Sequence, residues 1–211
     1  IFTNTGCTKQ KAESKEGCSV TDTGDGRTIL ELAKQKGALL FGTFKLSAGG
    51  TSHYYFDGRM ITLDPEGAYN ICKALLPILR ECGATAIAGP TLGADPIVSA
   101  LSVISYTEGK AIPGLIIRKE TKQHGGQRII EGPIVEGAKV AVVDDTCTSG
   151  ASLLHAIDAV EGVGCTVVKV ISILDRNEGG SDIIKKKGYD FISLLEANKA
   201  GEIVSVRSRS L

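Results

Sequence analysis

Two adjacent carboxylates, Asp144 and Asp145, stand between an apolar run and a stretch of small hydroxyl residues. Residues 140–143 are β-branched or small without a polar break, which predicts a strand that is buried on both faces and ends where the acids begin. Beyond the hydroxyl residues, apolar side chains recur at helical spacing, at Leu153, Leu154, Ile157 and Val160. The predicted order is therefore strand, acidic pair, hydroxyl-rich loop and helix.

This order of elements suits a phosphate attached to a sugar. A loop of small residues at a helix N-terminus exposes backbone N–H groups to a phosphate, and Thr and Ser hydroxyls add donors. Carboxylates repel a phosphate but can bind the sugar hydroxyls, or a metal held by the sugar. The stretch has neither the Gly-Lys-Ser/Thr of a Walker loop nor a Gly-x-Gly-x-x-Gly turn. A ribose 5-phosphate site is thus favoured over an ordinary strand–turn–helix with a capping serine and surface acids.

Residues 142–150, Val-Val-Asp-Asp-Thr-Cys-Thr-Ser-Gly, closely resemble the phosphoribosyl pyrophosphate (PRPP) signature of type I phosphoribosyltransferases. The resemblance implies that this segment binds the ribose and the 5-phosphate of PRPP. The residues implied are Asp144, Asp145, Thr146, Cys147, Thr148, Ser149, Gly150, Ala151 and Ser152. A nucleophilic role for Cys147 has no support from the sequence, and its small size is the simpler explanation.

A second segment, residues 118–128, is rich in basic residues and glycine within a chain of zero net charge. By composition it is a solvated loop. Its spacing, however, resembles the catalytic loop of the orotate phosphoribosyltransferase family position for position, at Arg118, Lys119, Lys122 and His124. The resemblance implies that these four residues bind PRPP, and that Lys122 and His124 act in catalysis with Asp144 and Asp145.

Residues 38–62 predict short alternating strands around a glycine turn, with the aromatic run Tyr54, Tyr55 and Phe56. This run either packs a small β layer or forms a lid over a planar base, and alternation lets at most two of the three face a site. The segment resembles the N-terminal hood of the same family through its Phe41-Gly-x-Phe start and through Asp57 and Arg59. A family lysine is replaced by Ser47, and whether Lys45 compensates is open.

Two further turns are candidates for ligand contacts. Residues 89–96 form a glycine-bearing strand-to-helix turn, which is either a plain connection or a second anion site; in the family this position carries a pyrophosphate-binding loop. Arg176 directly follows the predicted strand 166–174, where a cation can bind a carboxylate or form a surface ion pair. The resemblance implies orotate binding by Arg176, Thr148, Tyr55 and Phe56.

The remaining pattern predicts an α/β fold. Thr28 is a candidate helix cap, and Asp64-Pro65 begins a helix that ends near Gly83. Strands and helices then alternate up to residue 195, which predicts a type I phosphoribosyltransferase-like parallel sheet covered by helices, with a small N-terminal β hood. The expected domains are an irregular leader (1–26), a helix and hood (27–65) and a PRPP-binding core (66–205).

Composition narrows the function classes. Lysine plus arginine equals aspartate plus glutamate, at 24 each, which argues against nucleic acid or an anionic membrane as partner. The six cysteines form no Cys-x-x-Cys pair, so free thiols in a cytoplasmic protein are expected, with a Cys7–Cys18 bridge left open.

The resemblance as a whole implies an orotate phosphoribosyltransferase, which converts orotate and PRPP to orotidine 5′-monophosphate and pyrophosphate in pyrimidine biosynthesis. It implies Mg²⁺ as cofactor, held mainly through PRPP and near Asp144 and Asp145, and a homodimer with shared active sites. The alternatives are a phosphoribosyltransferase for purine bases and a regulator that binds PRPP without turnover. The regulator would need a DNA-binding module, which the sequence does not reveal.

Overall fold

The computed structural model describes residues 26–45, 51–120 and 129–206. Its centre is a seven-stranded sheet in the order β5-β4-β3-β6-β7-β8-β9. The strands are β3 (Ala86–Pro90), β4 (Gly114–Ile117), β5 (Ile130–Glu131), β6 (Lys139–Cys147), β7 (Thr166–Asp175), β8 (Phe191–Ala197) and β9 (Ile203–Ser205). Neighbouring inner strands are parallel, as predicted, whereas the edge strands β5 and β9 pair antiparallel and were not foreseen.

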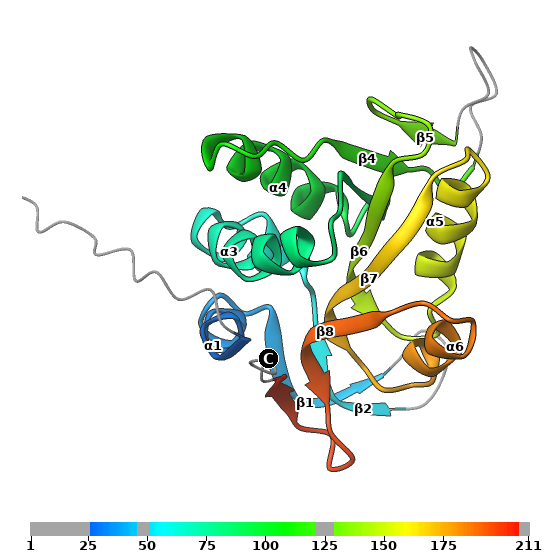
Figure 1. The fold of residues 1–211 in the computed structure, drawn as a ribbon. Coiled ribbons are helices and arrows are strands. Elements are labelled where there is room, and N and C mark those ends of the chain that lie inside the picture. Colours follow the sequence, from blue (N-terminus) through cyan, green and yellow to red (C-terminus); the bar gives the residue numbers. More distant parts are fainter. Residues whose placement is uncertain (1–25, 46–50, 121–128, 207–211) are drawn as a thin grey trace, which may run out of the picture.

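Helices cover both faces of the sheet (Figure 1). One face carries α1 (Gly26–Gln35), α3 (Pro65–Glu81) and α4 (Asp95–Thr107), and the other carries α5 (Ala151–Glu161) and α6 (Gly180–Lys186). Each face has its own apolar core, and the inner strands supply residues to both. Burial on both sides explains the continuous β-branched runs of these strands. The prediction of an α/β sheet covered by helices is confirmed.

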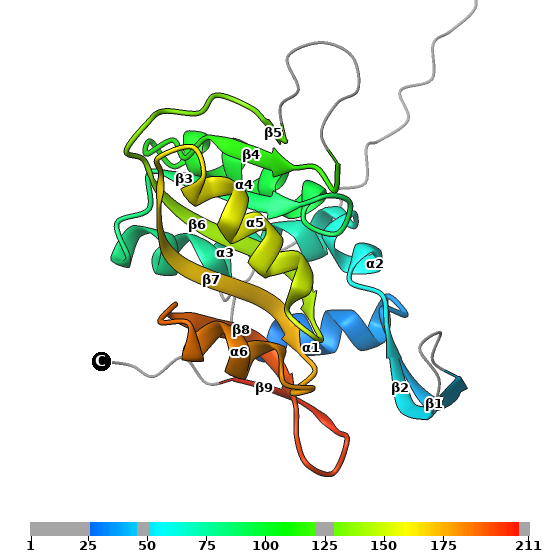
Figure 2. The ribbon, with the colours of Figure 1, turned by 90° about the vertical axis from the view of Figure 1, so that its right-hand side faces the viewer.

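The hood is an antiparallel hairpin of β1 (Leu39–Lys45) and β2 (Thr51–Phe56) that projects from the body (Figure 2). The short helix α2 (Arg59–Thr62) leads from it to α3. The predicted cap at Thr28 is wrong, because α1 already includes Gly26 and Thr28 lies inside it. The small antiparallel hood itself is confirmed.

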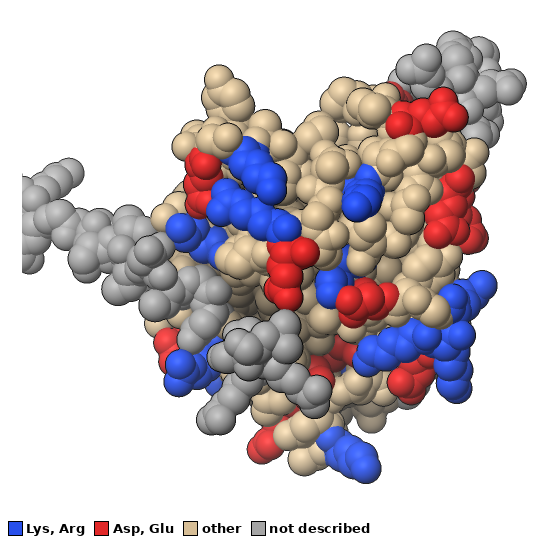
Figure 3. Space-filling model, viewed as in Figure 1, with Lys and Arg blue, Asp and Glu red and all other residues tan. Residues whose placement is uncertain are grey.

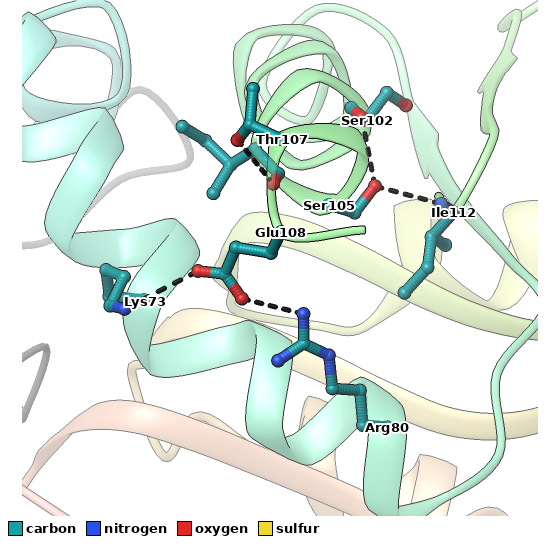
Figure 4. A network of polar contacts seen from close by, with 8 residues as sticks. Lys73, Arg80, Ser102, Ser105, Thr107, Glu108 and Ile112 are labelled. Atoms are coloured by element: carbon teal, nitrogen blue, oxygen red, sulfur yellow. Dashed lines mark hydrogen bonds and ion pairs between the residues drawn. The ribbon is translucent and has the colours of Figure 1, made fainter. Parts of the chain in front are cut away.

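The predicted start of α3 is confirmed at its N-cap. The Asp64 carboxylate accepts a hydrogen bond from the backbone N–H of Gly67 at 3.0 Å, and Pro65 occupies the first helical position. Glu108 ties α3 to the end of α4, since its carboxylate accepts from Arg80 Nη2 at 2.6 Å and from Lys73 Nζ at 3.4 Å (Figure 4). These contacts hold the helix pair that supports the first half of the sheet.

Basic and acidic side chains are intermixed on the face shown in Figure 3. The basic cluster at its lower right lies over α6, where Lys185 and Lys186 end the helix. Among the described residues, no helix has the length and apolar character needed to cross a bilayer.

Candidate active site

The sheet reverses its winding between β3 and β6. β4 pairs with one side of β3 and β6 with the other, so the turns after β3 and β6 diverge at the carboxyl edge of the sheet. Ligands in open α/β sheets bind at such a switch point, outside the carboxyl ends of the strands. The acidic pair and the 89–96 turn meet here, because β3 and β6 are parallel neighbours that pair at Ala86 with Val140, Ile87 with Ala141 and Ala88 with Val142.

Strand β6 is longer than the sequence predicted. The prediction that it ends before the acids is wrong, because parallel pairing with β7 continues through Asp144 with Ser172 and on to Cys147 with Asp175. Asp144 and Asp145 are therefore strand residues, held by the backbone ladder rather than by a loop. A strand fixes carboxylate positions more firmly than a loop does, which suits a site that must hold a sugar in one orientation.

A cavity of about 350 Å³ opens at this edge. Its walls come from the hood, from the turn after β3, from the end of β6 and from the residues just after β4. The lining residues are Tyr55, Phe56, Asp57, Gly58, Arg59, Pro90, Thr91, Leu92, Gly93, Lys119, Asp144, Asp145, Thr146 and Ser152. The cavity joins predicted site residues from four separate segments of the chain.

The acidic pair is largely withdrawn from water. Asp144 is 6% exposed, and burial together with the neighbouring charge of Asp145 raises the pKa of Asp144 to about 8. Burial also raises the pKa of Asp145, while the positive charge of Arg59 opposes that rise. Gly58 and Gly93 flank Asp145 so closely that a Cβ at either position would lie 2.7 Å from its side chain. Burial thus disfavours ionisation of both carboxyl groups at once, and a cation or sugar hydroxyls beside them would favour the ionised forms.

A smaller cavity of about 90 Å³ lies next to the first, at the N-terminus of α5. Its lining residues are Asp144, Thr146, Thr148, Ser149, Gly150, Ala151, Ser152 and Leu153. Gly150 caps the helix with a φ of 77°, a left-handed conformation that favours glycine. Hydroxyls and a helix N-terminus thus surround one cavity, called here the phosphate hollow, and this arrangement suits a phosphate, whose binding there stays a prediction.

Cys147 does not face this hollow. Its side chain is 1% exposed, and burial raises the pKa of its thiol to about 12. A thiol of that pKa is protonated near neutral pH and is a poor nucleophile. The structure thus places Cys147 in the core, in agreement with the expectation that it is not a nucleophile, and its implied part in PRPP binding stays a prediction.

Of the three consecutive aromatic residues of the hood, two line the larger cavity and the third is buried in the core. Tyr55 is 46% exposed and lines the larger cavity with Phe56, whereas Tyr54 is 5% exposed. The guanidinium of Arg176 lies over the Tyr54 ring, 5.0 Å from its centroid, and its Nε donates to the Glu178 carboxylate at 2.8 Å. Arg176, which directly follows β7, thus contacts the hood at Tyr54, the neighbour of Tyr55 on the opposite face of β2, and is not among the residues that line the cavity.

The basic segment is described only at its root. Lys119 lines the larger cavity, and the Arg118 guanidinium lies 3.5 Å from Glu131 Oε1. Lys122 and His124 lie outside the described residues, as do Ser47, Cys7 and Cys18. Their predicted roles stay predictions.

Asp57 and Arg59 are in the site although the sequence analysis gave them no role there. Arg59 donates to Asp57 from Nε at 2.9 Å and from Nη2 at 3.1 Å, a bidentate pair at the mouth of the cavity. The sequence feature that could have indicated this role is an acidic and a basic residue directly after a predicted strand. The position of this pair, close enough for the charge of Arg59 to act on Asp145, depends on where the hood and α2 lie relative to the sheet.

Comparison with known proteins agrees with this geometry. Residues 79–206 match the family model of the phosphoribosyl transferase domain. The chain is 46% identical over 166 residues to the orotate phosphoribosyltransferase of Nostoc sp., covering 78% of this chain and 80% of that protein. It is 42% identical over 156 residues to the orotate phosphoribosyltransferase of Aquifex aeolicus, covering 74% of this chain and 85% of that protein.

A solved structure gives the same result. The orotate phosphoribosyltransferase of Mycobacterium tuberculosis in complex with 5-phospho-alpha-D-ribosyl 1-diphosphate (PRPP) superposes with a TM-score of 0.66 at 32% identity. The match covers 80% of this chain and 95% of that chain. The chain therefore belongs to the orotate phosphoribosyltransferase family.

Proposed function

We propose that this chain transfers the 5-phosphoribosyl group of PRPP to orotate, which yields orotidine 5′-monophosphate and pyrophosphate in pyrimidine biosynthesis. The observation that carries the proposal is one continuous site at the switch point, where a hydroxyl-lined phosphate hollow, a buried acidic pair and an aromatic hood wall adjoin. Each part matches one part of the reactants: the 5-phosphate, the ribose and the planar base.

The reaction needs positioning and charge stabilisation more than covalent help from the protein. A ring nitrogen of orotate, after losing its proton to solvent, forms the new bond to the glycosidic carbon. The bond from that carbon to pyrophosphate breaks, and its electron pair leaves with pyrophosphate. Positive charge develops on the ribose in between, and Asp144 and Asp145 lie where they can hold the ribose hydroxyls near that charge. Thr148, Ser149 and Ser152 hold the 5-phosphate, and Lys119 offsets the charge of the departing pyrophosphate.

Mg²⁺ suits this donor set when it binds together with PRPP. No group of three metal-ligating side chains gathers in the described parts of the chain, so these parts offer carboxylates but no complete metal cage. Mg²⁺ is commonly held by one or two carboxylates plus substrate phosphates. Asp144 and Asp145 are the residues that would face it, and it would supply positive charge to offset the negative charge of the leaving group.

Recognition of orotate combines the hood and the strand end after β7. Tyr55 and Phe56 line the larger cavity and are proposed as the wall for the planar ring, and Thr148 lines the smaller cavity. Arg176, which lies against Tyr54 outside both linings, is proposed with Thr148 as a donor to the polar edge of orotate. A purine base has no carboxylate for Arg176, so substrate preference separates orotate from the purine alternative. A non-catalytic regulator would bind PRPP and consume neither reactant.

We also propose a homodimer in which Lys122 acts in the partner's site. Lys122→Ala and Asp145→Asn, each nearly inactive, are mixed so that subunits exchange. Random pairing makes about half of the dimers mixed, so roughly a quarter of wild-type activity should return if the sites are shared. A mixture that stays inactive after verified exchange would show that the basic segment serves its own subunit.

The direct test is an ultraviolet assay of orotate consumption with PRPP and Mg²⁺, with adenine and hypoxanthine as competing bases. We expect turnover with orotate and none with the purines. The Asp145→Asn variant should lose most of the turnover and keep the circular dichroism spectrum of the native protein. Consumption of a purine instead, or no consumption of any base, would overturn the assignment.

A further inference from the structure

Arg118 is fixed through both of its peptide groups. Its backbone N–H donates to the carbonyl of Ile129 at 2.8 Å. Its own carbonyl lies 2.9 Å from Nε2 of His155, which is in the middle of α5, 37 residues away in sequence. Because a carbonyl only accepts hydrogen bonds, the imidazole must carry a proton on Nε2 and donate it. The backbone just beyond β4 is therefore held from two sides.

The carbonyl of Arg118 matters because it shares a peptide plane with the next residue. That plane contains the backbone nitrogen and the Cα of Lys119, so fixing the oxygen also fixes where the Lys119 side chain starts. Lys119 lines the larger cavity together with Asp144 and Asp145. A rotation of this peptide would move the lysine relative to the acids.

Helix α5 joins this hydrogen bond to the phosphate hollow. Ser152 lines both cavities in the first turn of α5, and His155 follows three residues later, on the same side of the helix. The segment that holds the 5-phosphate and the segment that presents Lys119 are thus anchored on one rigid element. A rigid support of this kind keeps two ends of one substrate at a constant separation.

We propose that His155 is a positioning residue for PRPP: it holds the Arg118 carbonyl so that Lys119 faces the pyrophosphate side of the cavity. This inference rests on the proposed function, which assigns PRPP to the site. It predicts a defect on the PRPP side of the reaction, since the hood and Arg176 are not part of the contact.

The test is a double-mutant cycle between His155 and Lys119. His155→Leu removes the donor at similar size, His155→Gln keeps an N–H at the equivalent distance along the side chain, and Lys119→Ala removes the group that is positioned. Asp158→Asn is the control, since Asp158 is an exposed residue one turn further along the same helix. Steady-state rates are measured with each reactant varied in turn, and thermal unfolding confirms the fold.

We expect His155→Leu to lower kcat/KM for PRPP about fivefold to tenfold, the size of one lost hydrogen bond that positions a reacting group. The KM for orotate should stay within about twofold, and His155→Gln should recover most of the loss. With Lys119→Ala already present, His155→Leu should have almost no further effect, because residues that act through each other are not additive. Equal effects of His155→Leu in both backgrounds, or no rescue by glutamine, would overturn the proposal.

A failure of the proposed function would look different. If wild-type protein binds PRPP but leaves orotate unchanged, the reaction assignment fails, and the same cycle is then measured as PRPP affinity by calorimetry. Coupling between His155 and Lys119 in that measurement would support the positioning role, and additive losses would refute it.

Discussion

Gly180 packs against the backbone of residues 148–150, which line the phosphate hollow, and replacing it with alanine should displace that backbone. Its backbone N–H donates to the carbonyl of Thr148 at 3.0 Å. A Cβ on Gly180 would lie 2.4 Å from the Gly150 nitrogen and 2.5 Å from the Thr148 oxygen. Both contacts are backbone atoms, so no side chain can swing away, and the loop must retreat by about 1 Å to reach van der Waals separation.

The magnitude follows from that displacement. Overpacking of this kind costs about 1–3 kcal/mol of stability. A reacting group misplaced by about 1 Å can lose roughly 100-fold in rate. We therefore expect Gly180→Ala to lower kcat/KM for PRPP by about tenfold to 100-fold, with a much smaller change in the KM for orotate.

Gly179→Ala is a matched control. Gly179 has a φ of 95°, so alanine there strains the backbone, but a Cβ would meet nothing within 4 Å. Both variants should lose stability, and only Gly180→Ala should lose PRPP efficiency, as measured by thermal unfolding and steady-state kinetics. If the two variants lost efficiency equally, or if Gly180→Ala kept it within about twofold, the contact would not control the phosphate loop.

Three further results are expected. Arg176→Ala should raise the KM for orotate far more than that for PRPP, by the roughly 1.5–3 kcal/mol of a charge-assisted pair; a defect confined to PRPP would place Arg176 on the phosphate side. The pKa of Asp144 is raised from 3.8 to about 8 in the folded protein, so the folded state holds this proton more tightly than the unfolded state does. The resulting contribution to the free energy of unfolding is complete below pH 3.8 and is lost as the pH rises to about 8. Asp144→Asn should therefore unfold at a higher temperature than wild type at pH 8 without ligand, and parallel pH profiles would contradict this. Cys147, with a buried thiol whose pKa is about 12, should resist iodoacetamide until the protein is unfolded in urea, as mass spectrometry of the native protein can check.

The sequence by itself determined the features that depend on neighbouring residues. The order strand, acids, hydroxyls and helix around Asp144 and Asp145 was readable because a phosphate hollow is built from one continuous segment. The alternation of β-branched runs and helical spacing predicted the layered sheet, because burial on both faces leaves that pattern in each strand. The N-cap at Asp64 was equally local, since it needs only the N–H three residues later.

The tertiary structure alone decided how distant segments meet. The residues around Asp145 do not indicate that β6 continues beside β7 as far as Cys147. The length of a strand depends on how far the neighbouring strand can pair with it. The two-residue strand β5 is too short to leave a pattern. Tyr54 is buried with Arg176 over its ring while Tyr55 lines the cavity, and His155 on α5 contacts the carbonyl of Arg118 just beyond β4. These contacts depend on the packing of elements that are far apart in the chain, and a local pattern carries no information about its partner's position.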